Sequence, residues 1–244
     1  MILLIEDDQI TTHILTALMK RQRWECLVAT SCADALQMIS SVPTDLVITD
    51  INLPDGNGLD LVESMIVKPW LQDIPVMICT ADGKRATVER ALGMGCVDFV
   101  KKPINVDQMQ SRIGRALTRA PRRWENWREM IKRLRVDGRS FFPLLQLARE
   151  QLVRLVEKLE RWNPQTGDVD ELTADVQRLR SAALNVGAVR CVSMIDFLWT
   201  GSASEQDVRD LAEALGIEAR SFEKAIANRN AGLATLGATA GSAR

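Results

Sequence analysis

Acidic, hydroxyl and lysine side chains stand directly after short apolar segments in the first half of this 244-residue chain: Glu6, Asp7, Asp50, Thr80 and Lys102. In an open parallel sheet, ligands bind outside the carboxyl ends of the strands, so we expect these five side chains to meet at one edge. Three carboxylates in one place repel one another unless a cation joins them, and carboxylate oxygens suit Mg²⁺. The pattern therefore predicts a magnesium site in which Asp50 is a nucleophile and Lys102 neutralises the charge of a phosphoryl product.

Each of these residues also has an ordinary structural interpretation when it is taken alone. An Asp at the end of a strand is often a turn or capping residue, and a Lys-Pro pair is often a turn. What distinguishes this chain is the order of acid pair, acid, threonine and Lys-Pro, separated by helix-like stretches. The motifs LLIEDD, VITDINLPDGNG, VMICTAD and DFVKKP carry that order. They resemble the receiver domain of two-component response regulators over residues 1–120.

The resemblance implies a role for each residue at this edge. Asp50 would accept a phosphoryl group from a cognate histidine kinase. Asp7 and Asp50 would bind Mg²⁺ directly, Glu6 through water, and Asn52 through its backbone carbonyl. Lys102 would pair with the phosphoryl group. The domain would catalyse only its own phosphorylation and dephosphorylation, so we do not expect an enzyme with an external product.

The resemblance also implies a switch. Thr80 would hydrogen-bond the phosphoryl group, and Phe99 would turn inward as Thr80 leaves its position. Asn52 and Asp82 occupy the positions at which members of the family tune the lifetime of the phosphate. Because both are polar and could position water, we predict a short-lived phosphoaspartate.

The fold class follows from the apolar pattern of residues 1–120. Short apolar strands that alternate with helical stretches predict a doubly wound, five-stranded parallel sheet of the flavodoxin-like type. Gly56 and Gly58 lie in the loop after Asp50, where the backbone must bend. We expect strands near 2–6, 25–29, 45–49, 75–79 and 96–100, and helices near 9–22, 32–41, 58–67, 84–93 and 105–119.

The composition points to a cytoplasmic protein. Of the residues, 46% are apolar, and the formal net charge is −1, which argues against general nucleic-acid binding but allows a local basic patch. The five cysteines form no CxxC pair, as is typical of reduced thiols in a cytosol. The sequence has neither a signal peptide nor an apolar run of membrane-spanning length, so we expect neither export nor a membrane location.

Residues 121–139 form a basic, amphipathic connector. Trp124, Trp127, Ile131 and Leu134 recur at helical spacing among many arginines and lysines. Three interpretations stay open. The connector is a helix with solvated charges, a seam that makes a homodimer, or a face that contacts phosphates.

Residues 140–234 predict an all-α effector domain, and the small, polar residues 235–244 predict a disordered tail. We expect a helical bundle with helices near 144–162, 168–188, 190–199, 204–215 and 218–230. Asp168 or Asp170 would cap the second of them, and Gly187 would end it.

The segment QRLRSAALNVGA (177–188) resembles the central helix of histidine phosphotransfer domains. It keeps the leucine, the basic residue and the small residues of that helix, but Gln177 stands where those domains carry the phosphorylated histidine. An amide cannot form a phosphoramidate, and the only histidine of the chain, His13, lies in the first helix of the receiver-like part. The resemblance therefore implies a phosphotransfer-incompetent domain that binds a partner kinase or receiver. A four-helix bundle of unrelated ancestry is the alternative.

The segment 208–226 fits the spacing of a helix-turn-helix, with Ala212 at the helix contact and Gly216 at the turn. Arg220 and Lys224 would then contact the major groove of DNA. Against this interpretation, the segment offers few basic or amide side chains for reading bases, and two glutamates interrupt them. We therefore favour a response regulator that acts through protein binding, with a DNA-binding transcriptional regulator as the alternative.

Overall fold

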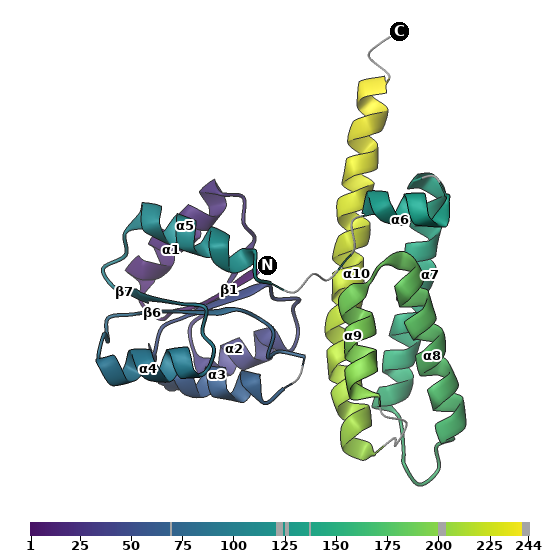
Figure 1. Ribbon diagram of the computed structural model, residues 1–244, viewed down its shortest axis with the longest axis horizontal. Coiled ribbons are helices and arrows are strands. Elements are labelled where there is room, and N and C mark those ends of the chain that lie inside the picture. The colour runs from purple at the N-terminus through teal and green to yellow at the C-terminus, as the bar shows by residue number, and fades with distance from the viewer. Residues whose placement is uncertain (69, 121–123, 125–126, 137, 200–203, 241–244) are drawn as a thin grey trace. The chain divides into compact units, whose positions relative to one another are not determined.

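The computed structural model describes residues 1–68, 70–120, 124, 127–136, 138–199 and 204–240. The chain divides into two units, Met1–Pro121 and Arg122–Arg244. Figure 1 shows their elements. Within the described residues, none of the helices combines the length and the apolar character needed to cross a membrane.

The first unit contains a five-stranded parallel sheet in the order β2-β1-β3-β6-β7. Its strands are β1 (Ile2–Ile5), β2 (Cys26–Ala29), β3 (Leu46–Thr49), β6 (Val76–Thr80) and β7 (Asp98–Lys101). Its helices are α1 (Gln9–Arg21), α2 (Cys32–Ile39), α3 (Gly58–Ile66), α4 (Arg85–Gly93) and α5 (Val106–Leu117). Helices α1 and α5 cover one face of the sheet, and α2, α3 and α4 cover the other (Figure 1).

The predicted fold class is confirmed. The central strands ILLI (2–5) and LVIT (46–49) are buried along their whole length, because a parallel sheet that helices cover on both faces leaves no solvated side. Leu15, Met19 and Ile113 pack from α1 and α5 onto these strands and form the core of that face.

A small two-stranded ladder interrupts the loop after Asp50. Its strands, β4 (Asn52–Leu53) and β5 (Gly56–Asn57), pair antiparallel. This hairpin was not among the predicted elements. Side-chain caps close the loops on the same edge of the sheet, since the side chains of Asp8, Ser31 and Asn57 accept backbone N–H groups at the starts of α1, α2 and α3.

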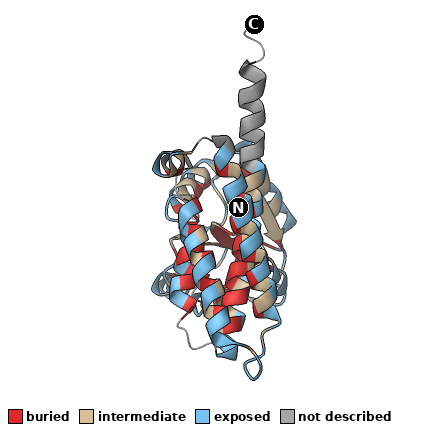
Figure 2. Cartoon of the chain, turned by 90° about the vertical axis from the view of Figure 1, so that its right-hand side faces the viewer, coloured by how far each residue is buried: buried red, intermediate tan, exposed pale blue. Residues whose placement is uncertain are grey.

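The second unit is all-α. It contains α6 (Trp127–Leu134), α7 (Gly138–Glu160), α8 (Val169–Val186), α9 (Val189–Leu198) and α10 (Glu205–Ala240). Helix α7 contacts α8 and α10, and α9 contacts the same two helices, so the four long helices form a bundle. Figure 2 shows the buried residues in stripes along these helices. As predicted, Asp168 caps α8, and Gly187 ends it in the left-handed conformation with φ 71°.

Two predictions for the end of the chain are wrong. The segment 208–226 is not a helix-turn-helix, because α10 continues through Gly216 without a turn. Leu211, Leu215 and Phe222 are buried on both sides of Gly216, so burial along one helix face outweighs the weak helix propensity of a single glycine. The predicted disordered tail at 235–244 is wrong for residues 235–240, which belong to α10. The remaining residues, 241–244, lie outside the described part.

The predicted connector is described only in part. Residues 127–134 form α6, and residues 121–123, 125–126 and 137 of the connector lie outside the described residues. Trp124 belongs to the second unit, where its indole N–H donates to the hydroxyl of Ser221 at 3.1 Å. Its ring meets that of Phe222 edge-on, with 4.5 Å between the ring centroids. Trp124 therefore packs on the bundle.

Candidate functional site

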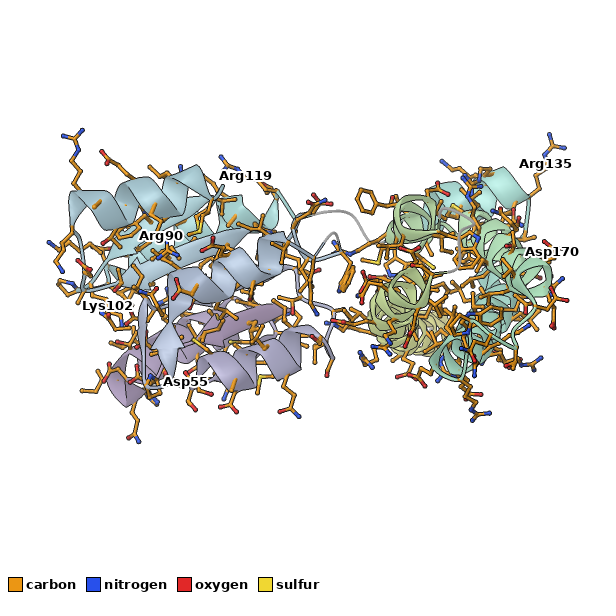
Figure 3. All side chains as sticks on the ribbon, turned by 90° about the horizontal axis from the view of Figure 1, so that it is seen from below. Asp55, Arg90, Lys102, Arg119, Arg135 and Asp170 are labelled. Carbon is orange, nitrogen blue, oxygen red and sulfur yellow. The ribbon has the colours of Figure 1, made fainter. Side chains whose placement is uncertain are left out.

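Three of the five predicted side chains meet in direct contact at the carboxyl edge of the sheet. Glu6 follows β1, Asp50 follows β3, and Lys102 follows β7 (Lys102 is labelled in Figure 3). The Nζ atom of Lys102 lies 2.6 Å from Oδ2 of Asp50 and 2.8 Å from the carboxylate of Glu6. Glu6 is 1% exposed and Asp50 7% exposed, so one ammonium group compensates two buried carboxylates. Asp7 follows Glu6 in the chain and is exposed.

Backbone N–H groups orient the Asp50 carboxylate. Its Oδ1 atom accepts the N–H of Ile51 at 2.5 Å and that of Asn52 at 3.2 Å. The hydroxyl of Thr49 donates to the carbonyl of Asp50 at 2.7 Å. Oδ1 is therefore fixed by the loop, and Oδ2 faces the lysine. The two N–H donors therefore fix the orientation of the carboxylate relative to Lys102.

Gly58 packs directly against the backbone of Asp50. A Cβ atom at this position would lie 2.0 Å from the carbonyl oxygen of Asp50 and 2.9 Å from the hydroxyl oxygen of Thr49. The N–H of Gly58 donates to the carbonyl of Ile51 at 2.7 Å. A side chain at this position would therefore displace the backbone that carries Asp50.

Burial and neighbouring charges shift the pKa values of Glu6 and Lys102. Burial raises the pKa of Glu6 above its ordinary value and outweighs the opposing effect of Lys102. Burial by itself would lower the pKa of Lys102, but hydrogen bonds and charge from Asp50 and Glu6 raise it. Lys102 is therefore held in its charged form, whereas burial makes the charged form of Glu6 less stable.

Replacing Glu6 by glutamine is expected to change how stability depends on pH. Because the pKa of Glu6 is raised in the folded state, its contribution to stability is fully present below its ordinary value of 4.5. That contribution is lost as the pH rises through the folded pKa. The free energy of unfolding of the wild type should therefore fall relative to Glu6→Gln between pH 4.5 and neutrality. Urea unfolding of both proteins across this range measures the difference, and a pH-independent difference would refute the assignment.

Thr80 ends β6, the strand between β3 and β7, and Asp82 follows it at the same edge of the sheet. The fully buried Thr80 hydroxyl accepts the N–H of Asp82 at 3.2 Å. The carboxylate of Asp82 accepts the N–H of Lys84 at 3.0 Å and the hydroxyl of Thr87 at 3.3 Å. The hydrogen bond from the N–H of Lys84 holds the pKa of Asp82 below its ordinary value. Asp82 thus orders the start of α4 in this structure, and its effect on the lifetime of the phosphate stays a prediction. Phe99 is half-buried, and its predicted inward turn also stays a prediction.

The predicted metal ligands have suitable chemistry but are not gathered around one point. In the part of the chain that the structure describes, no three His, Cys, Asp or Glu side chains are grouped closely enough to hold a metal ion. Oε2 of Glu6 is buried without a well-directed hydrogen bond, although Lys102 Nζ lies 2.8 Å away. This oxygen, the Asp50 carboxylate, the exposed Asp7 and the carbonyl of Asn52 are all hard donors of the kind that Mg²⁺ takes.

The comparison with known proteins decides the identity of the first unit. Residues 2–114 match the family of response regulator receiver domains. The first unit is a receiver domain. Domains of this family are the receiver parts of two-component response regulators.

Two curated relatives share this receiver domain. The transcriptional regulatory protein KdpE of Staphylococcus aureus is 32% identical over 112 residues, which are 46% of this chain and 47% of that protein. The DNA-binding transcriptional regulator NtrC of Rhizobium meliloti is 27% identical over 160 residues, which are 65% of this chain and 31% of that protein. The chain thus spans less than half the length of these relatives.

A solved structure covers the same domain. It is the receiver domain of a sensor histidine kinase from Pseudomonas aeruginosa, described with a magnesium ion coordinated in the active site cleft. It is 20% identical, has a TM-score of 0.45, and covers 48% of this chain and 96% of its own.

The receiver domain also contains site residues that the sequence analysis did not assign. Thr49 bonds the backbone of Asp50, Asp55 bonds the start of α2, and Asn57 bonds the start of α3. The only sequence signal for them is their place in the loop that flanks Asp50, where Asp and Asn are common turn residues.

In the second unit, Gln177 is exposed on α8, and its carbonyl accepts the hydroxyl of Ser181 at 3.0 Å. Arg180, which matches the basic residue of phosphotransfer domains, bonds both carboxylate oxygens of Asp196 on α9. Arg220 is exposed and Lys224 half-buried on the unbroken α10, so neither lies on a recognition helix that follows a turn.

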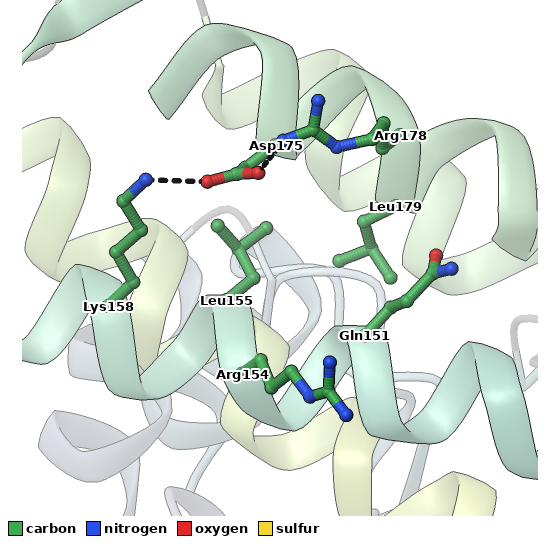
Figure 4. A pocket seen from close by; sticks show the side chains of 7 residues that line it. All are labelled: Gln151, Arg154, Leu155, Lys158, Asp175, Arg178 and Leu179. Carbon is green, nitrogen blue, oxygen red and sulfur yellow. Dashed lines mark hydrogen bonds and ion pairs between the residues drawn. The ribbon is translucent and has the colours of Figure 1, made fainter. Parts of the chain in front are cut away.

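A charged groove of about 310 Å³ runs between α7 and α8 (Figure 4). Its floor is apolar, from Leu155 and Leu179. Asp175 bonds both Lys158, at 2.6 Å, and Arg178 along one side of it. Arg154 and Gln151 line the other side. Gln177, on the same helix, is exposed and does not line this groove.

Proposed function

We propose that this chain is a response regulator that is phosphorylated on Asp50 and acts by binding another protein through its helical second unit. The observation that carries the first part is the contact between Lys102 and Asp50. A lysine held at 2.6 Å from a carboxylate at the carboxyl edge of a receiver sheet is placed to neutralise the charge of a phosphoaspartate.

In the proposed reaction, an oxygen of the Asp50 carboxylate attacks the phosphorus atom of a phosphohistidine in the cognate kinase. The P–O bond forms as the P–N bond breaks, and the electron pair of that bond stays on the imidazole. The N–H groups of Ile51 and Asn52 keep the carboxylate oriented. The ammonium group of Lys102, which now pairs with Asp50, then pairs with the negatively charged phosphoryl group. Asp7 and Asp50, Glu6 through water, and the backbone carbonyl of Asn52 would hold Mg²⁺, which would help to neutralise the charge on the phosphoryl oxygens.

The signal then passes through Thr80. Its hydroxyl, which now accepts the Asp82 N–H, donates to the phosphoryl group instead, and Phe99 fills the space that Thr80 leaves. Phosphorylation adds about two negative charges, enough to bias a two-state surface of this kind. Asn52 and Asp82 flank the site and make the phosphoaspartate short-lived.

Protein binding is the output that the second unit supports best. Gln177 is exposed on α8. The resemblance of 177–188 to phosphotransfer domains implies that this face would meet a receiver or a kinase. A glutamine there allows docking without accepting phosphate. The names of KdpE and NtrC as transcriptional regulators make DNA the competing partner, but the continuous α10 removes the segment that was expected to read it.

A gain-of-function variant tests this resemblance. In the full-length chain, Gln177→His should acquire an acid-labile, alkali-stable phosphate when it is incubated with a phosphorylated receiver domain, and the wild type should not. Ser181→His, one turn further along the same face, is the matched control and should stay unphosphorylated. A variant Gln177→His that takes up no phosphate would favour an unrelated helical bundle.

The competing output has its own test. The full-length chain, with and without phosphorylation, is titrated with mixed genomic DNA fragments across a salt series. We expect no binding beyond what low salt gives to any basic surface. Sequence-enriched binding that Arg220→Ala weakens would overturn the protein-binding proposal and leave the phosphorylation of Asp50 untouched.

A further inference from the structure

Asp55 joins the loop of the phosphoacceptor to a helix that carries no part of the site. It lies in the turn between β4 and β5, in the loop that follows Asp50, and is labelled in Figure 3. Its Oδ1 atom accepts the N–H of Cys32 at 2.7 Å, and its Oδ2 atom accepts the N–H of Ala33 at 2.9 Å. Both carboxylate oxygens thus bond the first turn of α2.

These bonds are stronger than those of an ordinary turn. The first N–H groups of a helix have no partners within the helix and lie at the positive end of its dipole, so a carboxylate is the favoured acceptor there. The bonds from Ala33 and Cys32 hold the pKa of Asp55 below its ordinary value. Asp55 therefore stays charged, and the bonds persist throughout the neutral pH range.

Helix α2 does not depend on Asp55 for its own cap. The hydroxyl of Ser31 accepts the N–H of Asp34 at 3.1 Å, which is the usual local cap. Asp55 satisfies the two preceding N–H groups from a separate part of the chain. Its bonds are therefore a tertiary link, and their main consequence falls on the hairpin that carries Asp55.

The other contacts of the hairpin lead directly to the acceptor. The N–H of Asn52, in β4, donates to Asp50, and the N–H of Gly58, after β5, donates to Ile51. The hairpin is thus fixed at its base beside Asp50 and at its tip by Asp55. A hairpin of two-residue strands is only marginally stable by itself, so its position depends on such external contacts.

We propose that Asp55 is a positioning residue, which sets the place of the β4–β5 hairpin and with it the backbone of Asn52, whose carbonyl is a predicted Mg²⁺ ligand. The consequence for phosphorylation rests on the proposed function of Asp50. The consequence for metal binding does not rest on that function, because the affinity for Mg²⁺ can be measured without phosphorylation. Outer contacts of this kind behind a metal site typically change metal affinity by about tenfold to 100-fold when they are removed.

The test is a titration of the full-length chain with MgCl₂, followed through backbone amide shifts in NMR spectra, with Asp55→Ala, Asp55→Asn and two controls. Ser31→Ala removes the local cap of α2 but leaves the link intact. Asp60→Asn removes one acidic charge from the start of α3 without touching the hairpin. We expect Asp55→Ala to weaken Mg²⁺ binding by about tenfold. Asp55→Asn, which keeps one acceptor oxygen, should lie between, and both controls should stay within about twofold of wild type.

Each other result has a definite meaning. Equal weakening in Asp55→Ala and Ser31→Ala would assign the effect to the stability of α2, and equal weakening in Asp60→Asn would assign it to charge. Either result overturns the proposal, as does unchanged Mg²⁺ binding in both Asp55 variants. If Asp55→Ala does not fold, Asp55→Asn and its amide exchange at Cys32 and Ala33 give the same decision. Failure of wild-type phosphorylation by acetyl phosphate, with the expected Mg²⁺ result, would reject the proposed function and keep the link.

Discussion

Gly58→Ala is expected to lower the free energy of unfolding of the receiver domain by about 3 kcal/mol, because an overpacked position forces its surroundings to move. Its new Cβ atom would lie 2.0 Å from the carbonyl oxygen of Asp50, and no rotation of a side chain can relieve a contact with backbone. The backbone of the acceptor must therefore shift. A displacement of about 1 Å at a reacting group can cost about 100-fold in rate, so phosphorylation of Asp50 should fall by a similar factor.

Gly56→Ala is the matched control, two residues earlier in the same loop. A Cβ atom there would lie 3.4 Å from the sulfur of Cys32, which is an ordinary contact. Hydrogen exchange with mass spectrometry measures the stability of the receiver peptides, and acetyl phosphate measures the rate. If both alanine variants behave alike, the effect belongs to the flexibility of the loop and not to the contact of Gly58 with Asp50.

Glu218→Ala is expected to cost the second unit about 3–5 kcal/mol, the usual result of removing one partner of a buried ion pair. The carboxylate of Glu218 lies 3.4 Å from the guanidinium of Arg190 and joins α10 to α9, and both side chains are less than a tenth exposed. Without Glu218, the buried guanidinium of Arg190 loses the charge of this carboxylate. Urea unfolding, followed by the exchange of amides in α9 and α10, measures the loss.

The double variant Arg190→Met with Glu218→Leu separates charge from packing. Replacing both partners by apolar residues of similar volume is often neutral, so the double variant should recover most of the loss. Phosphorylation of Asp50 should be unchanged in both variants, since the pair belongs to the other unit. A loss below about 1 kcal/mol in Glu218→Ala would mean that solvent reaches Arg190 and that the pair is not a buried one.

The edge of the receiver sheet could be predicted from the sequence because its determinants are local. Apolar strands of four or five residues, each followed by an acid, a threonine or a lysine, place those side chains at one edge in any parallel sheet. Glu6, Asp50 and Lys102 indeed meet there. The caps at Asp168 and Gly187 were predictable for the same reason, since a cap depends on its own turn alone.

Features that depend on distant segments could not be predicted in this way. The bonds of Asp55 to α2 and the contact of Gly58 with Asp50 exist only once the sheet has brought their partners together. The helix-turn-helix prediction failed at Gly216 because the burial of Leu211 and Phe222, on either side, depends on the rest of the bundle. A local pattern of small and apolar residues cannot tell a turn from a helix that packs along its whole length.

The most direct test of the account is the phosphorylation of the full-length chain. Wild type and Asp50→Asn are incubated with acetyl phosphate and MgCl₂, and the intact mass and the modified peptide are measured, with EDTA as a further control. We predict one phosphoryl group per chain on Asp50, formed only with Mg²⁺, and none on Asp50→Asn. Equal modification of both proteins, or a modification of the wild type that EDTA does not prevent, would contradict the assignment of this edge as a Mg²⁺-dependent phosphoacceptor site.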